Sequence, residues 1–283
     1  MTTSLFFVVV FFKGINSSPY LLYALDQKGT IIVVRKERVE NLRIKIHLNI
    51  KELETNKQRI PVCYRMMLLS LIKQGIHQSD SALYETLYQE KQVAKKLTFS
   101  LFMNHLNYLK EVNRFEFDGA VLTISSSDVL FMSKLLNGLS YVKTYRYKNQ
   151  YVLSIFKIEL ENLKTITGNK ATFTTMSPIL IEDKNAKPVL VTADNFVEEL
   201  NTYTNIRFQS LYGRELKNPL VLAEHQFKKR VIKEVSHMDD ERILTYTTQG
   251  GSFTLQGDSE DLRLIYLDGL GKRTGQGFGC LHL

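Results

Sequence analysis

Several residue types are scarce in this chain, and their scarcity excludes several classes of protein. The 283 residues include no tryptophan, five prolines and two cysteines, Cys63 and Cys280. Two cysteines form neither a disulfide framework nor a zinc ligand set, and they fit a reducing cytoplasm. The apolar run at residues 5–12 is too short to span a bilayer, and it lacks the flanks of a signal peptide. We therefore expect a cytoplasmic protein with no membrane segment, no metal and no cofactor.

Positive charge is in excess. Lys and Arg number 37 against 29 Asp and Glu, for a formal net charge of +8. A hydrophobic content of 44% with 23% charged residues is typical of globular proteins, and the length suits two ordinary domains. Clustered cations gain affinity by releasing counterions from phosphates, so the charge indicates a polyanionic partner.

Glycine is concentrated at the C-terminal end. Residues 269–279 hold Gly269, Gly271, Gly275, Gly277 and Gly279 of the fifteen glycines in the chain, with Lys272 and Arg273 between them. Such clusters mark backbone with positive φ or with a close neighbour, and successive N–H groups there can form an anion-binding concavity. A Walker loop needs Ser or Thr where Arg273 stands, so nucleotide loops fit poorly. We predict that this stretch binds phosphate.

The first half of the chain predicts alternating strands and helices. Apolar periodicity, turn residues and the helix-ending pair Asn137-Gly138 define the segments. Their order is β-α-β-β-α-β, which is the ferredoxin-like pattern. The strands are expected at 42–50, 97–103, 115–117, 121–124, 141–147 and 151–160, and the helices at 62–76, 84–88 and 128–136.

The second half repeats the pattern. A helix capped by Asp194 or Asn195 extends to about residue 212, and a last helix at 258–267 leads into the glycine stretch and a final strand. The strands are expected at 172–181, 219–235 and 242–254. The predicted fold class is α+β, with tandem ferredoxin-like (RRM-like) domains and a C-terminal glycine-rich loop.

The spacing Gly-Leu-Gly, five residues, Gly-Phe-Gly resembles the C-terminal signature of the CRISPR-associated repeat-processing endoribonucleases of the RAMP superfamily. Three further segments resemble that family: residues 97–102 its Leu-Phe-Thr-Phe-Ser strand, 135–139 a helix end, and 174–179 the strand that opens its second domain. The resemblance covers residues 42–283 in order. It implies two ferredoxin-like domains, 42–163 and 164–283, the second ending in an RNA-binding loop.

The resemblance also implies an activity. These proteins cut precursor CRISPR RNA within each repeat without a metal, by attack of the 2′-OH, and leave a 5′-OH and a 2′,3′-cyclic phosphate. The implied partners are repeat RNA and a CRISPR effector complex, with a homodimer left open. Two alternatives also stay open: a catalytically inactive homologue that binds repeat RNA, and a structural subunit of an effector complex.

Catalytic candidates follow from the family pattern. The family places a Tyr, a His and a Lys at positions that align here with Lys73, Gln89 and Lys95. Gln89 can act as neither acid nor base, which leaves His77, one helical turn after Lys73, as the proton-transfer candidate. Lys73 and Lys95 are predicted to carry the electrostatic part of catalysis. The proposed catalytic set is therefore His77, Lys73 and Lys95.

Two further basic segments were considered for RNA binding. Lys228, Lys229 and Arg230 form a basic run in a predicted strand and are expected to grip RNA. Lysines and arginines also alternate with tyrosines over residues 141–148. Strand alternation separates Arg146 and Lys148 from the tyrosines, so a core face backed by a solvated face competes there with RNA binding.

Residues 1–41 precede the family resemblance and form an extension of uncertain status. One alternative is a mis-called start, with initiation at Leu42. The other is an N-terminal hairpin with strands at 5–12 and 30–34.

If residues 1–41 are an extension, a chain that starts at Leu42 should fold and bind RNA as well as the full chain. Circular dichroism, size-exclusion chromatography and an RNA-binding titration measure this. Aggregation or weakened binding of the shortened chain would instead make the N-terminal segment part of the first domain.

Overall fold

The computed structural model describes residues 22–25, 31–35, 42–89, 94–235 and 242–283. In the N-terminal part, β1 (Leu22–Leu25) pairs antiparallel with β2 (Ile31–Arg35) in a two-stranded sheet of their own. The second strand of the predicted hairpin overlaps β2, but β2 pairs with β1. Residues 5–12, its predicted partner, lie outside the described residues.

The first domain is built on an antiparallel sheet with the strand order β5-β8-β3-β10-β9. Alternation along the first strand decides its two faces. Ile44, Ile46 and Leu48 are fully buried, whereas Asn49 is exposed. The strands are β3 (Leu42–Glu52), β5 (Thr98–Asn104), β8 (Gly119–Ser126), β9 (Thr144–Tyr147) and β10 (Tyr151–Leu160).

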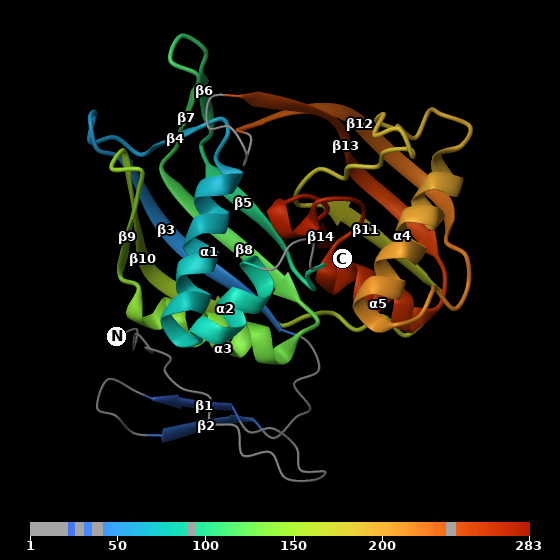
Figure 1. The fold of residues 1–283 in the computed structure, drawn as a ribbon, viewed down its shortest axis with the longest axis horizontal. Coiled ribbons are helices and arrows are strands. Elements are labelled where there is room, and N and C mark those ends of the chain that lie inside the picture. Colours follow the sequence, from blue (N-terminus) through green and yellow to red (C-terminus); the bar gives the residue numbers. More distant parts are fainter. Residues whose placement is uncertain (1–21, 26–30, 36–41, 90–93, 236–241) are drawn as a thin grey trace.

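Three helices lie along the apolar face of this sheet (Figure 1): α1 (Arg65–Ser79), α2 (Ser81–Tyr88) and α3 (Val129–Tyr141). The prediction that Asn137-Gly138 ends a helix is wrong, since α3 continues to Tyr141. Gly138 lies where α3 crosses α1, and a Cβ there would come within 1.7 Å of the Gly75 carbonyl oxygen. Its missing side chain therefore permits close helix packing.

Two smaller features complete the first domain. The predicted hairpin at 115–124 is divided between β8 and a separate sheet with the order β4-β7-β6, formed by β4 (Arg59–Pro61), β6 (Asn107–Leu109) and β7 (Arg114–Glu116). On β9, Tyr145 and Tyr147 pack against the core while Arg146 is exposed. The competing interpretation, a core face of tyrosines backed by a charged face, is therefore the one observed.

The second domain repeats the topology. Its sheet has the order β12-β13-β11-β14, with all pairs antiparallel. Residues 176–181, predicted as strand, follow the end of β11 and join the sheet through one bridge, Ile179 to Gln249. The elements are β11 (Lys170–Thr175), α4 (Phe196–Tyr212), β12 (Val221–Val235), β13 (Ile243–Gln256), α5 (Ser259–Asp268), the 3₁₀ helix η1 (Thr274–Gln276) and β14 (Leu281–His282).

In both sheets the second, third, first and fourth core strands lie side by side in that order, which is the ferredoxin-like arrangement. The predicted fold class is confirmed. Each sheet has its own hydrophobic core, and the exact boundary between 163 and 164 stays a prediction. The long strands β12 and β13 extend beyond the second sheet toward the first domain (Figure 1), where β12 contacts α1. Among the described helices, none is both long and apolar enough to cross a bilayer.

Candidate active site and RNA interface

Two lysines from separate elements meet at one tyrosine. Lys73 lies on α1, Lys95 lies just before β5, and Tyr88 is the last residue of α2. The Nζ atoms of Lys73 and Lys95 lie 5.1 and 5.0 Å from the centroid of the Tyr88 ring. Both distances fall within the range of cation–π contact. The structure thus brings together two of the three predicted catalytic residues.

The environment of this pair shifts its proton affinities. Burial lowers the pKa of Lys73. Burial, followed by the positive charge of Lys73, lowers the pKa of Lys95. Both shifts disfavour the ammonium form, as expected when cations leave water and approach each other. Burial raises the pKa of Tyr88, so its hydroxyl stays protonated. That hydroxyl has no hydrogen-bond partner among the described residues.

The position of Tyr88 follows from a local sequence signal. Asp80 interrupts the helix, and its carboxylate accepts a hydrogen bond from the Leu83 backbone N–H at 2.9 Å, which caps the N-terminus of α2. Lys134 from α3 holds the same carboxylate at 3.2 Å. The cap sets the start of α2, and Tyr84 and Tyr88 then share one face of it, one turn apart.

His77 lies at the end of the same aromatic row. It is exposed, in the last turn of α1, and its ring meets the Tyr84 ring edge-on at 5.0 Å. Tyr84 in turn lies 5.6 Å from Tyr88, between ring centroids. His77 is therefore joined to the lysine pair through two tyrosines. Gln89, at the position of the family histidine, is exposed at the C-terminus of α2.

The glycine stretch reaches this site from the other domain. Its 3₁₀ helix η1 packs against α1 and β5. A Cβ on Gly275 would lie 3.8 Å from the Lys95 Cβ, in ordinary contact. The lysine pair and the glycine loop therefore form one continuous surface, although 174 or more residues separate their sequence positions.

Four of the five glycines, however, have a packing role. Gly269, Gly271, Gly277 and Gly279 are buried, with φ between 63° and 85°. A Cβ on Gly279 would lie 1.9 Å from the Leu270 carbonyl oxygen, and one on Gly277 would lie 2.6 Å from the Phe99 ring. These close neighbours explain why the positions require glycine.

The backbone N–H groups of this stretch are also largely engaged. The N–H of Gly279 donates to the Pro178 carbonyl at 2.8 Å, and that of Gly277 donates to Thr274 at 3.0 Å. The N–H of Gly269 donates to Ile265 at 2.9 Å. The expected anion-binding concavity therefore does not form at these three glycines. Binding of RNA by the stretch remains a prediction, with Gly275 and the adjacent cations as its accessible part.

The two cations of the loop already have partners within the protein. The Lys272 Nζ lies 3.2 Å from the Glu182 carboxylate. The exposed Arg273 stacks over the Tyr246 ring at 4.8 Å and donates to the Gln276 side chain at 3.1 Å. Arg273 adopts a left-handed backbone with φ of 58°, an uncommon conformation for a residue with a side chain.

The predicted basic run lies on β12, at the edge of the second sheet. Lys228, Lys229 and Arg230 are all exposed. Lys228 pairs with Gly250 and Arg230 with Thr248 of β13, so these two cations share one face and Lys229 projects from the other. The open face nearby is rich in hydroxyl groups, since Thr174 bonds to Ser252 at 3.1 Å.

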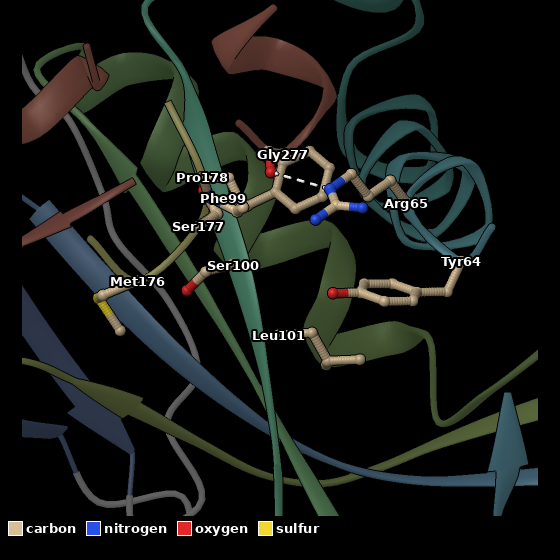
Figure 2. A pocket seen from close by; sticks show the side chains of 9 residues that line it. All are labelled: Tyr64, Arg65, Phe99, Ser100, Leu101, Met176, Ser177, Pro178 and Gly277. Atoms are coloured by element: carbon tan, nitrogen blue, oxygen red, sulfur yellow. Dashed lines mark hydrogen bonds between the residues drawn. The ribbon is translucent and has the colours of Figure 1, made fainter. Parts of the chain in front are cut away.

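Arg65 is a site residue that the sequence did not suggest. Its Nε donates to the Gly277 carbonyl at 3.2 Å, and its Nη1 lies 2.7 Å from the Glu234 carboxylate at the end of β12. Figure 2 shows its guanidinium between the Tyr64 and Phe99 side chains in a small pocket between the domains. The pair is almost fully buried, with 7% of each side chain exposed. Arg65 therefore anchors the glycine loop to the start of α1.

Tyr88 could have been found from the sequence, because its spacing from Tyr84 places both on one helix face, but that spacing alone favours core packing. Arg65 carried no such signal, since its partners lie 169 and 212 positions away. The described residues contain no group of three or more His, Cys, Asp or Glu that could hold a metal ion.

Comparison with known proteins places this arrangement in a class. The structure is similar to that of a Cas6-related gene product from Pyrococcus furiosus, with a TM-score of 0.68, 19% identity and coverage of 86% of this chain and 98% of the other. It is similar to an RAMP protein binding different RNA substrates (0.67, 18%, 86% and 99%). It is also similar to a CRISPR associated protein Cas6 (0.65, 23%, 86% and 99%). The fold is therefore that of the tandem ferredoxin-like RAMP proteins.

The family model "CRISPR associated protein Cas6, C-terminal" matches residues 160–283. This part of the chain, which includes the glycine stretch, is a Cas6 C-terminal domain, and the resemblance stated from the sequence is confirmed. A comparison with curated proteins gives no match.

The buried glycines lead to a stability prediction. Gly277→Ala should lower the free energy of unfolding by about 2–5 kcal/mol, because a side chain at positive φ costs about 1–2 kcal/mol and overpacking about 1–3 kcal/mol. Gly275→Ala, two residues away in open space, is the matched control and should change stability by less than about 0.5 kcal/mol. Denaturant unfolding measures both, and equal stabilities of the two variants would contradict the packing role.

Proposed function

We propose that this protein is a metal-independent endoribonuclease that cleaves precursor CRISPR RNA within repeats. The 2′-OH of the nucleotide at the cut attacks the adjacent phosphorus, the bond to the 5′-oxygen of the next nucleotide breaks, and the products carry a 2′,3′-cyclic phosphate and a 5′-OH. The released pieces serve as guide RNAs in antiviral defence, in the cytoplasm and alongside a CRISPR effector complex.

The observation that carries this proposal is the lysine pair beside the Cas6-type glycine loop. Two cationic groups from different elements, both half-buried, lie at one aromatic ring where η1 packs. A phosphodiester that becomes a pentacoordinate phosphorane gains negative charge at this stage. Cations fixed before the reaction stabilise that charge without reorganisation.

The lowered pKa values of the lysines fit the same chemistry. A lysine in water is almost entirely protonated at neutral pH, whereas a lysine with a lowered pKa has a larger neutral fraction. A neutral amine can accept the proton of the 2′-OH, while its charged neighbour stabilises the phosphorane. General acid–base catalysis is most effective when the pKa lies near the working pH.

His77 is the second proton-transfer group of the proposal, and it would protonate the departing 5′-oxygen. Its exposure on the last turn of α1 leaves the ring accessible to RNA, and Tyr84 orients it. A lysine-only mechanism is the specific competitor, because the lysines and not His77 carry the shifted pKa values.

RNA binding would use the cations on the second domain. Lys228, Lys229 and Arg230 on β12, together with Lys272, Arg273 and Gly275 beside η1, lie on the two arms of the second domain that extend toward α1. Phosphate contacts from such residues position an RNA strand independently of sequence. An inactive repeat-binding homologue would use the same contacts, and Gln89 at the family histidine position is what keeps that alternative in view.

Cleavage of the cognate repeat tests the catalytic set. His77→Ala should lower the single-turnover rate by about 10²–10⁴-fold with little change in RNA affinity, because it removes one proton-transfer group. Lys73→Ala and Lys95→Ala should each lower the rate by about 10²–10³-fold, the size of a lost electrostatic contact to the transition state. Lys51→Ala, an exposed lysine on β3, is the control and should cleave at the wild-type rate.

The outcomes separate the competing mechanisms. A His77→Ala protein that cleaves normally, with both lysine variants inactive, establishes the lysine-only mechanism. Wild-type protein that binds the repeat and never cuts it establishes the inactive homologue instead. A repeat with a 2′-deoxy sugar before the cut should be bound and left intact, and EDTA should not slow cleavage of the native repeat.

The salt dependence of RNA binding tests the loop cations. Replacing Lys272 and Arg273 together with Gln should reduce the slope of log affinity against log salt by about one to two units, since each lost phosphate contact releases fewer counterions. Lys51 and Lys57, exposed at the far end of β3 and in the turn after it, give a control pair with the same change in charge. An unchanged slope would remove Lys272 and Arg273 from the interface.

A further inference from the structure

We propose that Tyr88 is a positioning residue whose ring face holds the ammonium groups of Lys73 and Lys95 at the reactive site. The inference deepens the proposed function and rests on it for its meaning, but its test does not require cleavage. No part of the family resemblance assigns a role to this tyrosine, and its place on α2 first indicated core packing alone.

The geometry singles out the ring. Lys73 and Lys95 come from α1 and from the segment before β5, so no shared backbone holds them together. Their Nζ atoms nevertheless lie 5.1 and 5.0 Å from the same centroid. Two like charges this close to one ring repel each other, and the electron-rich face of an aromatic ring attracts both. Tyr88 therefore offsets part of the repulsion that drives the lysines apart.

The hydroxyl of Tyr88 does not explain its position. It is buried and has no hydrogen-bond partner among the described residues, although a tyrosine hydroxyl without a partner normally costs free energy. A phenylalanine or leucine would avoid that cost if the position required apolar packing alone. The ring face is thus the part of Tyr88 with an evident task, and its contact with two cations distinguishes it from leucine.

Other charged groups surround the pair on each packed element. They could also affect the lysine charges, so a test must alter the ring without moving them. They are His77 on α1, Tyr84 and Glu85 on α2, Asp80 with its partner Lys134 from α3, Lys96 at the start of β5, and Arg273 beside η1.

The direct test is the titration of the two lysines in the free, full-length protein. The pH dependence of acylation of each amine, followed by mass spectrometry, gives the apparent pKa values of Lys73 and Lys95. Position 88 is varied through Tyr, Phe and mono-, di- and trifluorinated Phe, which weaken the negative ring face stepwise at nearly constant shape. Because a cation–π contact favours the charged amine, each fluorine should lower both pKa values, by about 0.5–1.5 pH units in total.

Cleavage by the same proteins gives the functional readout. Tyr88→Phe should keep the wild-type rate within about threefold, whereas the trifluorinated residue should lower the single-turnover rate by about tenfold or more. The lysine-controlled inflection of the pH–rate profile should move to lower pH, with an unchanged salt slope for RNA binding. Tyr147→Leu is the matched control, because Lys148 lies 5.8 Å from that ring on β9, away from the site; it should change neither Lys73 nor Lys95.

Three results would overturn the proposal: lysine pKa values that do not change across the fluorinated series, a Tyr88→Phe variant as impaired as the trifluorinated one, or a Tyr147→Leu variant with the same shifts. A wild-type protein that never cleaves RNA would refute the proposed nuclease function, yet the lysine titration would still decide the role of Tyr88. Because every residue in the series keeps an aromatic ring, loss of folding does not obscure the outcome.

Discussion

Arg65 joins three distant parts of the chain at one buried guanidinium. It begins α1, it donates to the carbonyl of Gly277 in the C-terminal loop, and it pairs with Glu234 at the end of β12. The guanidinium also lies over the rings of Tyr64 and Phe278. A buried charge is tolerated only when its partners are complete. The relative placement of α1, the glycine loop and the β12–β13 arm therefore depends on this residue, and with it the candidate active site.

Further contacts strengthen the same interface on both sides of Arg65. Arg43, fully buried on β3, donates to the backbone and hydroxyl oxygens of Tyr266 on α5. The Thr98 hydroxyl donates to the Phe278 carbonyl at 2.9 Å, directly before the strand that follows Lys95. Burial raises the pKa of Asp268, which accepts hydrogen bonds from Ser127 of the first domain. The domains thus meet through polar groups with specific partners, which restricts them to one arrangement.

This interface explains how a glycine-rich stretch can matter for chemistry without touching substrate. Gly269, Gly271, Gly277 and Gly279 allow the loop to lie against backbone and ring atoms at distances that no side chain would permit. The loop is thereby held with η1 against α1 and β5, beside Lys95. Its contribution to a reaction would be to fix one wall of the site, while Lys73, Lys95 and the aromatic residues of α2 supply the charges and their orientation.

Local sequence patterns were sufficient for most of the elements. Alternation along β3 and β11, apolar periodicity in α1 and α4, and the order of these segments predicted two ferredoxin-like domains, because such signals depend on which face of each segment is buried. The same reasoning failed at Asn137-Gly138. A glycine after Asn normally indicates a helix end, but here it lies inside α3, where the backbone of α1 requires its missing side chain.

The site was determined differently. Sequence alone identified Lys73, Lys95 and the glycine stretch, because their residue types and spacing match a family pattern. It could not show that Tyr88 lies between the two lysines, that Arg65 binds Gly277, or that most of the loop N–H groups are already used. Those facts depend on contacts between residues separated by up to 212 positions. Only tertiary packing decides such contacts, because a side chain's partners and its exposure to water are properties of the folded chain and not of any local segment.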